Sequence, residues 1–397
     1  MKKGGFDAVI GNPPYVYRNA LDLASRRYFA KTYASAEGNC DLYKFFLERG
    51  VNLVRKDGRI GMIVSASFLV QPTSARLRAF LLERTAIERL APLGPGAFAA
   101  ATVDTAVIVA QAGPASDDHV VVVAVPSTPC QLPDAAGLKV LQKRFATNPT
   151  RTFDYRLSEE GAALVKRLCQ QFPRIEEFYE FSVGINTGFI RSELVAATRL
   201  DSRYHEMILG SGISRYGTVR TEGWILYDPD FIRSRGRLGR SLPPERFFQE
   251  PKILVVRTRN LSLTRRIVAT IDRDAFYNLN RLTNVISRGA LPLEGLLGIL
   301  NSKLFNWLFS TRFLDYEVKP VYLRGCPLVD VTNGPMNEKV SGMLELHRQS
   351  ASARTSHERE LIDGQIAITD RQINELVYKL YGLTDKEIRL VEEETTR

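Results

Sequence analysis

Apolar runs and amphipathic segments alternate along the first third of the chain. Five short apolar runs have the length of buried strands and lie at residues 6–10, 59–64, 87–93, 105–111 and 120–125. Between them, residues 41–56 and 74–85 carry apolar side chains at helical spacing, so each segment predicts an amphipathic helix. Strands that alternate with helices in this way predict an open α/β sheet.

The pattern changes after Pro126, where three prolines within eight residues indicate a linker. Residues 126–345 mix short strands with loops and contain one long predicted helix, 293–313. Residues 346–397 carry isoleucine and leucine close to helical spacing. The chain therefore predicts three parts: an α/β sheet domain at 1–125, a mixed α/β domain at 126–345 and a C-terminal helical segment at 346–397.

The composition is that of a soluble globular protein, with 44% hydrophobic and 25% charged residues. No apolar run reaches the roughly 18 residues of a membrane-spanning helix, so no membrane partner is expected. The N-terminal residues lack the apolar stretch of a signal peptide. The four cysteines form neither a CxxC pair nor a disulfide framework. Together these features predict a cytoplasmic protein.

The net charge of the chain is +10, from 54 basic and 44 acidic residues. Most of the excess lies in residues 126–345, where 31 basic and 23 acidic residues give a net charge of +8. A positive excess favours a polyanionic partner such as nucleic acid, because binding releases condensed counterions. Charge alone does not separate such a protein from other basic proteins.

The sharpest chemical signal is Asn12-Pro13-Pro14-Tyr15, which directly follows the first predicted strand. Ligands of open α/β sheets bind at the carboxyl ends of the strands, where Asn12 is expected to lie. The two prolines stiffen the loop and remove two N–H donors. The Asn12 side chain and the Pro13 carbonyl then offer two acceptors for one amino group. Tyr15 adds a flat face for a planar base, whereas the alternative is an ordinary proline-rich turn.

The motif and several later segments resemble a known family. FDAVIGNPPYV (6–16) resembles motif IV of amino-methylating, S-adenosylmethionine-dependent methyltransferases. The following stretch, DLYKFFLERGVNLVRKDGRIGMIVSASFL with Arg76-Leu77-Arg78, resembles the gamma-ordered, adenine-specific DNA enzymes of restriction-modification systems. Further resemblance lies in residues 96–111 (motif VIII), 299–309 and 323–327 (the recognition domain), and 377–393 (the C-terminal end).

The resemblance implies a site-specific DNA adenine-N6 methyltransferase that uses S-adenosylmethionine, with double-stranded DNA as partner. It implies a Rossmann-like partial sheet, a target recognition domain and C-terminal helices. The target adenine is then flipped out of the duplex. Asn12 and the Pro13 carbonyl would accept hydrogen bonds from its amino group, and Tyr15 would stack on the base. Phe98 is the candidate for a second aromatic wall, with a core phenylalanine as the equally weighted alternative.

One departure from the family affects the cofactor. The family's Gly-rich cofactor loop lies before the NPPY strand, yet only eleven residues precede Asn12 and no GxGxxG follows a strand. The cofactor-binding residues therefore stay unassigned. We expect this chain to be the C-terminal part of a longer enzyme, with a separate N-terminal methyltransferase or nuclease segment or subunit as a further partner. Alone, it is expected to bind S-adenosylmethionine poorly.

Arginines are concentrated in the basic middle part of the chain. The candidates for DNA contact are Arg233, Arg235, Arg237, Arg240, Arg257 and Arg259. Arginine suits both phosphate and guanine contacts, and the alternative is a solvated basic surface. The four histidines show no metal-ligand spacing, so no metal is predicted.

Two other functions compete with DNA adenine methylation. NPPY also serves enzymes that methylate RNA guanine or protein glutamine, although the large basic segment argues against those smaller enzymes. The missing cofactor loop instead favours a catalytically inactive DNA-binding remnant.

Overall fold

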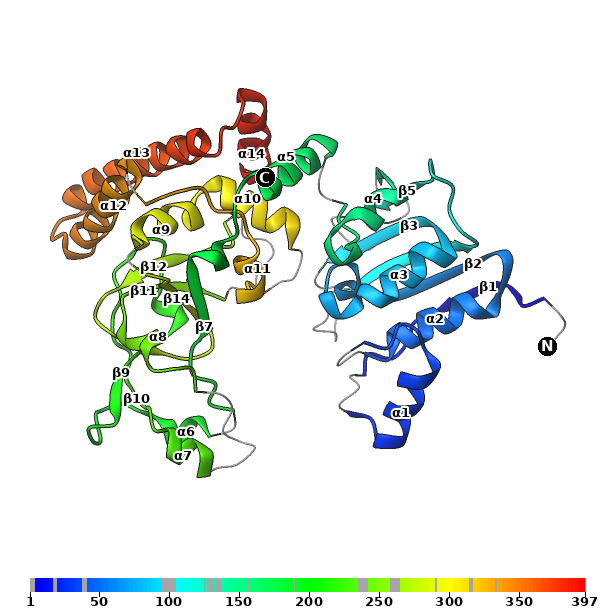
Figure 1. The fold of residues 1–397 in the computed structure, drawn as a ribbon, viewed down its shortest axis with the longest axis horizontal. Coiled ribbons are helices and arrows are strands. Elements are labelled where there is room, and N and C mark those ends of the chain that lie inside the picture. Colours follow the sequence, from blue (N-terminus) through cyan, green and yellow to red (C-terminus); the bar gives the residue numbers. More distant parts are fainter. Residues whose placement is uncertain are drawn as a thin grey trace. The chain divides into compact units, whose positions relative to one another are not determined.

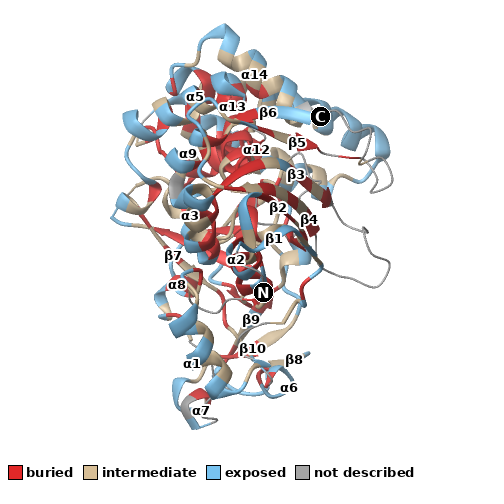
Figure 2. Ribbon diagram, turned by 90° about the vertical axis from the view of Figure 1, so that its right-hand side faces the viewer, coloured by how far each residue is buried: buried red, intermediate tan, exposed pale blue. Residues whose placement is uncertain are grey.

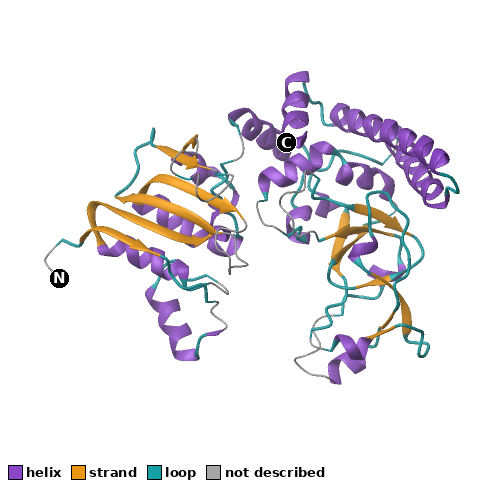
Figure 3. Ribbon diagram, turned by 180° about the vertical axis from the view of Figure 1, so that it is seen from behind, coloured by secondary structure: helices purple, strands orange, loops and turns teal. Residues whose placement is uncertain are grey.

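The computed structural model of the chain describes residues 4–16, 20–37, 41–94, 105–124, 126, 132, 137–155, 158–188, 190–234, 242–257, 265–289, 291–313, 317–332 and 334–396. The chain divides into two compact units, Met1–Ser158 and Glu159–Arg397 (Figure 1). The first is an α/β sheet and the second combines small sheets with C-terminal helices (Figure 3). The predicted fold class is therefore confirmed.

The first unit contains a six-stranded sheet in the order β1-β2-β4-β3-β5-β6. Its strands are β1 (Phe6–Gly11), β2 (Val54–Ser65), β3 (Thr85–Gly94), β4 (Thr105–Ala112), β5 (Val120–Ala124) and β6 (Gly137–Leu141). β1 pairs parallel with β2, and β3 pairs parallel with β5, whereas the other neighbours are antiparallel. The sheet is mixed because β3 and β4 are consecutive antiparallel neighbours, which need no crossover helix.

Helices α2 (Tyr43–Leu53) and α3 (Ala75–Arg84) cover one face of this sheet, and the views from opposite sides agree on this (Figures 1 and 3). The prediction extended α2 to residue 56, but β2 already begins at Val54, where pairing with Phe6 of β1 takes over from the helix. α2 packs closely because a Cβ at Gly50 would lie 2.6 Å from side-chain atoms of Ile60 and Met62.

Helix α1 (Leu23–Thr32), absent from the sequence prediction, has no buried residue and is tan and pale blue in Figure 2. One aromatic contact holds it, because Phe29 stacks on Phe45 of α2 with ring centroids 4.8 Å apart. Asp22 caps its N-terminus by accepting a hydrogen bond from the Ser25 N–H.

Residues 137–155 pack within the first unit. β6 pairs with β5, and helix α4 (Gln142–Thr147) follows it. The buried rings of Phe145 and Phe153 stack at 5.0 Å. The first compact unit therefore extends to Ser158.

The second unit contains two four-stranded sheets, in the orders β13-β9-β10-β8 and β12-β11-β14-β7. Their strands are β7 (Tyr179–Val183), β8 (Val195–Ala196), β9 (Tyr204–Ile208), β10 (Trp224–Leu226), β11 (Lys252–Val256), β12 (Ala269–Asp272), β13 (Tyr277–Asn278) and β14 (Leu282–Ser287). The helices among and after them are α5 (Glu159–Gln171), α6 (Arg191–Leu194), α7 (Pro229–Ser234), α8 (Arg246–Gln249), α9 (Leu293–Asn301), α10 (Lys303–Arg312), α11 (Pro320–Arg324), α12 (Pro335–Ser352), α13 (Ser356–Leu380) and α14 (Asp385–Thr396).

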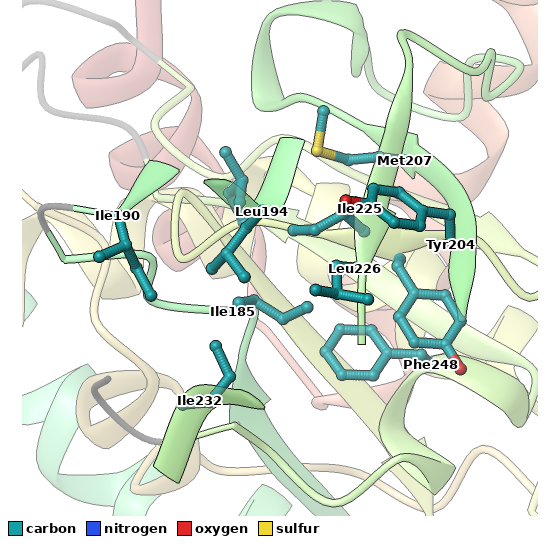
Figure 4. Packing of buried hydrophobic residues seen from close by; sticks show 11 residues of the cluster. Ile185, Ile190, Leu194, Tyr204, Met207, Ile225, Leu226, Ile232 and Phe248 are labelled. Atoms are coloured by element: carbon teal, nitrogen blue, oxygen red, sulfur yellow. The ribbon is translucent and has the colours of Figure 1, made fainter. Parts of the chain in front are cut away.

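Two of the buried clusters formed by described residues lie beside these sheets. The first gathers side chains from β9, β10, α6, α7 and α8, including Leu194, Ile225 and Phe248 (Figure 4). The second is smaller and contains Ile208 and Leu254. The two clusters meet at the end of β9, because Met207 belongs to the first and Ile208 to the second.

The predicted helix 293–313 is two helices, because it is interrupted at Ser302. The Ser302 hydroxyl accepts a hydrogen bond from the Phe305 N–H and so caps α10. The C-terminal helices belong to the second unit. Trp307 Nε1 donates to Glu394 of α14 at 2.6 Å, and Arg215 pairs with Asp370 of α13 at 2.6 Å.

A fully buried ion pair joins β11 to β12. Lys252 Nζ lies 2.5 Å from Asp272 and also donates to the Phe248 carbonyl. The Asp272 carboxylate further accepts from the N–H groups of Asp274 and Phe276. Burial lowers the pKa of Lys252, against the pull of Asp272. Removing one partner alone would leave the other charge buried without compensation.

Lys252→Met should therefore lower the free energy of unfolding by about 3–5 kcal/mol. Lys303→Met is the matched control, since Lys303 pairs with Glu392 at a partly exposed site and its loss should cost about 1 kcal/mol or less. Urea unfolding of both variants measures the difference. Equal losses would contradict the role assigned to the buried pair.

Candidate functional site

The candidate site lies where β1 and β2 leave the sheet. The two strands are parallel, with Gly11 opposite Met62, so their carboxyl ends meet at one edge. Asn12 follows the last residue of β1, and Ser65 is the last residue of β2. Ligands of open α/β sheets bind at this kind of edge.

The segment Asn12–Tyr15 is anchored at alternate residues. Pro13 is buried and Tyr15 is partly buried, whereas Asn12 and Pro14 are exposed. The Tyr15 hydroxyl donates to the Ile63 carbonyl of β2 at 3.3 Å. Just beyond, the Val16 carbonyl accepts from the Leu42 N–H at 3.0 Å. Within the described part of the chain, the exposed Asn12 side chain holds no hydrogen bond, so its amide oxygen is available to a ligand.

Tyr15 and Asp41 influence each other electrostatically. Partial burial and the nearby Asp41 charge raise the pKa of the Tyr15 hydroxyl, which therefore stays neutral and acts as a donor at neutral pH. Asp41 is 8% exposed, and this burial raises the pKa of its carboxyl group, against backbone N–H groups that lower it. Among the described residues, Asp41 Oδ1 has no hydrogen-bond partner.

Three polar residues of this edge escaped the sequence prediction. The Tyr43 and Ser67 hydroxyls lie 3.1 Å apart, and the Ser65 hydroxyl donates to Ser67 Oγ at 2.9 Å. The Tyr43 ring lies 6.3 Å from that of Tyr15. The available signal was serine directly after a buried strand, because the carboxyl ends of parallel strands lie at the same edge of a sheet.

Glu48 of α2 fixes the chain between Tyr15 and α2. Its buried carboxylate accepts hydrogen bonds from the N–H groups of Ala34 and Ser35, at 3.0 and 2.8 Å. The segment that follows α1 is thus tied to the helix that packs on the sheet. This contact also went unpredicted, because the sequence carries no signal for a carboxylate that binds two backbone N–H groups of a distant segment.

The remaining predicted site residues lie mostly outside the described residues. These are Phe98, Arg235, Arg237, Arg240 and Arg259, together with the side chain of Arg233, whose backbone belongs to α7. Arg257 is described and partly buried. It pairs with Glu317 at 3.0 Å and donates to the Asn280 carbonyl at 2.6 Å, so part of its bonding capacity is used within the protein.

No cluster of three or more metal-ligating side chains occurs among the residues that the structure describes. In that same part of the chain, no helix is long and apolar enough to cross a membrane.

Comparison with known proteins assigns two segments of the chain. Residues 1–97 match the family model described as Eco57I restriction-modification methylase. Residues 205–328 match the family model described as TaqI-like C-terminal specificity domain. These two matches confirm the resemblance to restriction-modification methyltransferases.

Individual relatives agree with this assignment. The chain is 22% identical over 451 residues to the type II methyltransferase M.BstVI of Geobacillus stearothermophilus, covering 98% of this chain and 75% of the relative. It is 30% identical over 92 residues to the type II restriction enzyme and methyltransferase RM.Eco57I of Escherichia coli, covering 22% of this chain and 9% of the relative. The fold resembles the type IIL restriction-modification enzyme MmeI, solved in complex with DNA, with a TM-score of 0.62 and 12% identity. That likeness covers 98% of this chain and 57% of the MmeI chain.

The raised pKa of Asp41 predicts a pH-dependent stability. A carboxyl group with a raised pKa in the folded state stabilises the fold below its ordinary value of 3.8, and this stability is lost as the pH rises through the folded-state pKa. Asp41→Asn removes the buried charge, so above that window the variant should have a higher Tm than the parent. Tm measured against pH tests this. Parallel curves for parent and variant would show that Asp41 carries no such cost.

Proposed function

We propose that this chain takes part in S-adenosylmethionine-dependent methylation of adenine N6 in duplex DNA, within a restriction-modification or similar defence system. The observation that carries the proposal is the Asn12 amide, exposed at the carboxyl end of β1 and followed by a buried proline and an anchored tyrosine. The match of this segment to a methylase family supports the reaction type. The specificity-domain match and the net charge of +10 support DNA as the substrate.

The chemistry assigned to this chain is the positioning of an amine. The Asn12 side-chain oxygen and the Pro13 carbonyl accept the two N–H bonds of an exocyclic amino group. This pairing draws the nitrogen lone pair out of conjugation with the base and directs it away from the loop. It also stabilises the positive charge that develops on the nitrogen as a methyl group is gained, before a proton is released.

The Tyr15 ring, held by the hydrogen bond from its hydroxyl to Ile63, favours a planar base over other amines. The Tyr15 ring offers a stacking face, and its hydroxyl bond to Ile63 limits how the ring can turn. A flipped adenine presents both the planar ring and the amino group that the two acceptors require. Glutamine side chains provide no ring to stack, which favours a nucleobase.

S-adenosylmethionine would supply the methyl group when bound. The buried Oδ1 of Asp41, without a partner among the described residues, is one acceptor beside the site. The sequence, however, contains no Gly-rich turn between a strand and a helix. Among the residues that the structure describes, we assign to this chain only those that hold the target amine.

Asn12→Ala should reduce methyl transfer by about 10²–10³-fold, because it removes an acceptor at the developing positive charge. Duplex binding should change little, since phosphate contacts dominate affinity. Asn52→Ala is the matched control, because Asn52 is exposed on α2 of the same unit. Transfer of a tritiated methyl group to duplex DNA measures the rates.

Where the chain alone shows no transfer, the assay is repeated with the cofactor-binding half of a related methylase added. Transfer by Asn12→Ala at the parent rate would exclude this loop as the amine site.

Tyr15→Phe and Tyr15→Ala should separate stacking from hydrogen bonding. The phenylalanine variant keeps the ring and loses only the long bond to Ile63, so its KM for DNA should stay within a few-fold of the parent value. The alanine variant loses the stacking face, worth about 1–3 kcal/mol per base, and its KM should rise about tenfold or more. Equal KM values for the two variants would contradict a stacking role.

A further inference from the structure

The second unit contains a cavity of about 390 Å³ at the boundary between its two sheets. Its apolar floor comes from both buried clusters, because Leu209 and Leu279 pack with the first and Ile208 and Val256 with the second. The other lining residues are Gly210, Ser211 and three arginines, Arg191, Arg257 and Arg281. No described lining residue is acidic or aromatic.

The three arginines differ in how far the protein already uses them. Arg257 is largely engaged, because it pairs with Glu317 and donates to the Asn280 carbonyl. Its buried Nε has no partner among the described residues. Arg191 and Arg281 have exposed side chains, for which the described part of the chain shows no ion pair. The lining therefore carries two uncompensated positive charges beside one compensated charge.

The wall that carries Arg281 is rigid. The Arg281 carbonyl accepts from the Arg257 N–H at 2.9 Å, and the Asn280 N–H donates to the Ile185 carbonyl at 3.0 Å. Arg257 thus holds this turn with both its backbone and its side chain. Arg191 begins α6, which is anchored by the fully buried Leu194. Both exposed guanidinium groups extend from fixed backbone, so less ordering is required when they bind an anion.

The lining chemistry selects one part of a nucleic acid. Guanidinium groups match phosphate oxygens, and aliphatic side chains suit the carbon face of a sugar. A base that is flipped out of the duplex, or contacted for sequence recognition, would be stabilised most by stacking on an aromatic face. The described lining offers no such face. We propose that this cavity anchors the sugar-phosphate backbone of a DNA strand, with Arg191 and Arg281 on phosphates, independently of sequence. This rests on the proposed function only in taking DNA as the partner.

Arg191→Gln combined with Arg281→Gln tests the proposal on the full chain. Binding to duplexes of random sequence is followed by fluorescence anisotropy over a range of salt concentrations. Each lost phosphate contact should reduce the slope of log K against log[salt] by about 0.9, so the double variant should flatten it by about 1.8. Arg354→Gln with Arg371→Gln removes the same charge from exposed positions on or beside α13 and should leave the slope nearly unchanged.

The outcomes separate this proposal from its alternatives. A flatter slope with an unchanged Tm, equal for every duplex tested, supports a backbone anchor. An unchanged slope overturns it, as does a loss of affinity for some sequences only, which would indicate base reading. A further result would overturn the proposal in favour of a small-nucleotide site. A free deoxynucleoside monophosphate would compete for the cavity at constant ionic strength, while the variants would bind duplex DNA as the parent does.

Failure of the cavity proposal can be distinguished from failure of the proposed function. If the arginines do not contact DNA, the parent still methylates duplex DNA and Asn12→Ala still reduces that transfer by about 10²–10³-fold. If the parent binds duplex DNA with the predicted arginine dependence but transfers no methyl group, only the catalytic proposal fails. A parent that binds no duplex DNA overturns both.

Discussion

The parallel pairing of β1 with β2 is the constraint on which the candidate site depends. It sets Gly11 opposite Met62, so the chain leaves β1 beside the end of β2, and Tyr15 reaches the Ile63 carbonyl. A close backbone approach makes this pairing possible, because a Cβ at Gly58 would lie 2.7 Å from the Asp7 carbonyl oxygen. β1 is also an edge strand whose side chains are largely exposed, with Ile10 86% exposed. The site therefore relies on one strand pairing, and a register shift would displace Tyr15 from the Ile63 carbonyl.

Much of the first unit could be predicted from sequence because its signals are local. The apolar runs and the two amphipathic helices are confirmed where the structure describes them, and Asn12 directly follows β1. The sequence prediction missed what depends on tertiary contacts. Helix α1 is held by stacking of Phe29 on Phe45, and the Tyr43–Ser67 bond joins residues that are distant in the chain. Neither contact leaves a periodic pattern that could be read from the chain.

In the second unit, local polar groups overrode an apolar pattern. The apolar run 293–313 predicted one helix, but the Ser302 hydroxyl caps a new helix and ends the first. The sequence prediction named Arg257 and a group of arginines around Arg237, but it missed Arg191 and Arg281, which line the cavity together with Arg257. Such a convergence depends on the order of strands in the two sheets, which the spacing of residues along the chain does not encode.

The central claim is that the Asn12 loop presents adenine N6 for methylation. The most direct measurement is nucleoside mass spectrometry of duplex DNA incubated with the protein and S-adenosylmethionine carrying an isotopically labelled methyl group. The account predicts label in N6-methyldeoxyadenosine alone. Label in a cytosine, in RNA or in protein, with none in adenine of the duplex, would contradict it.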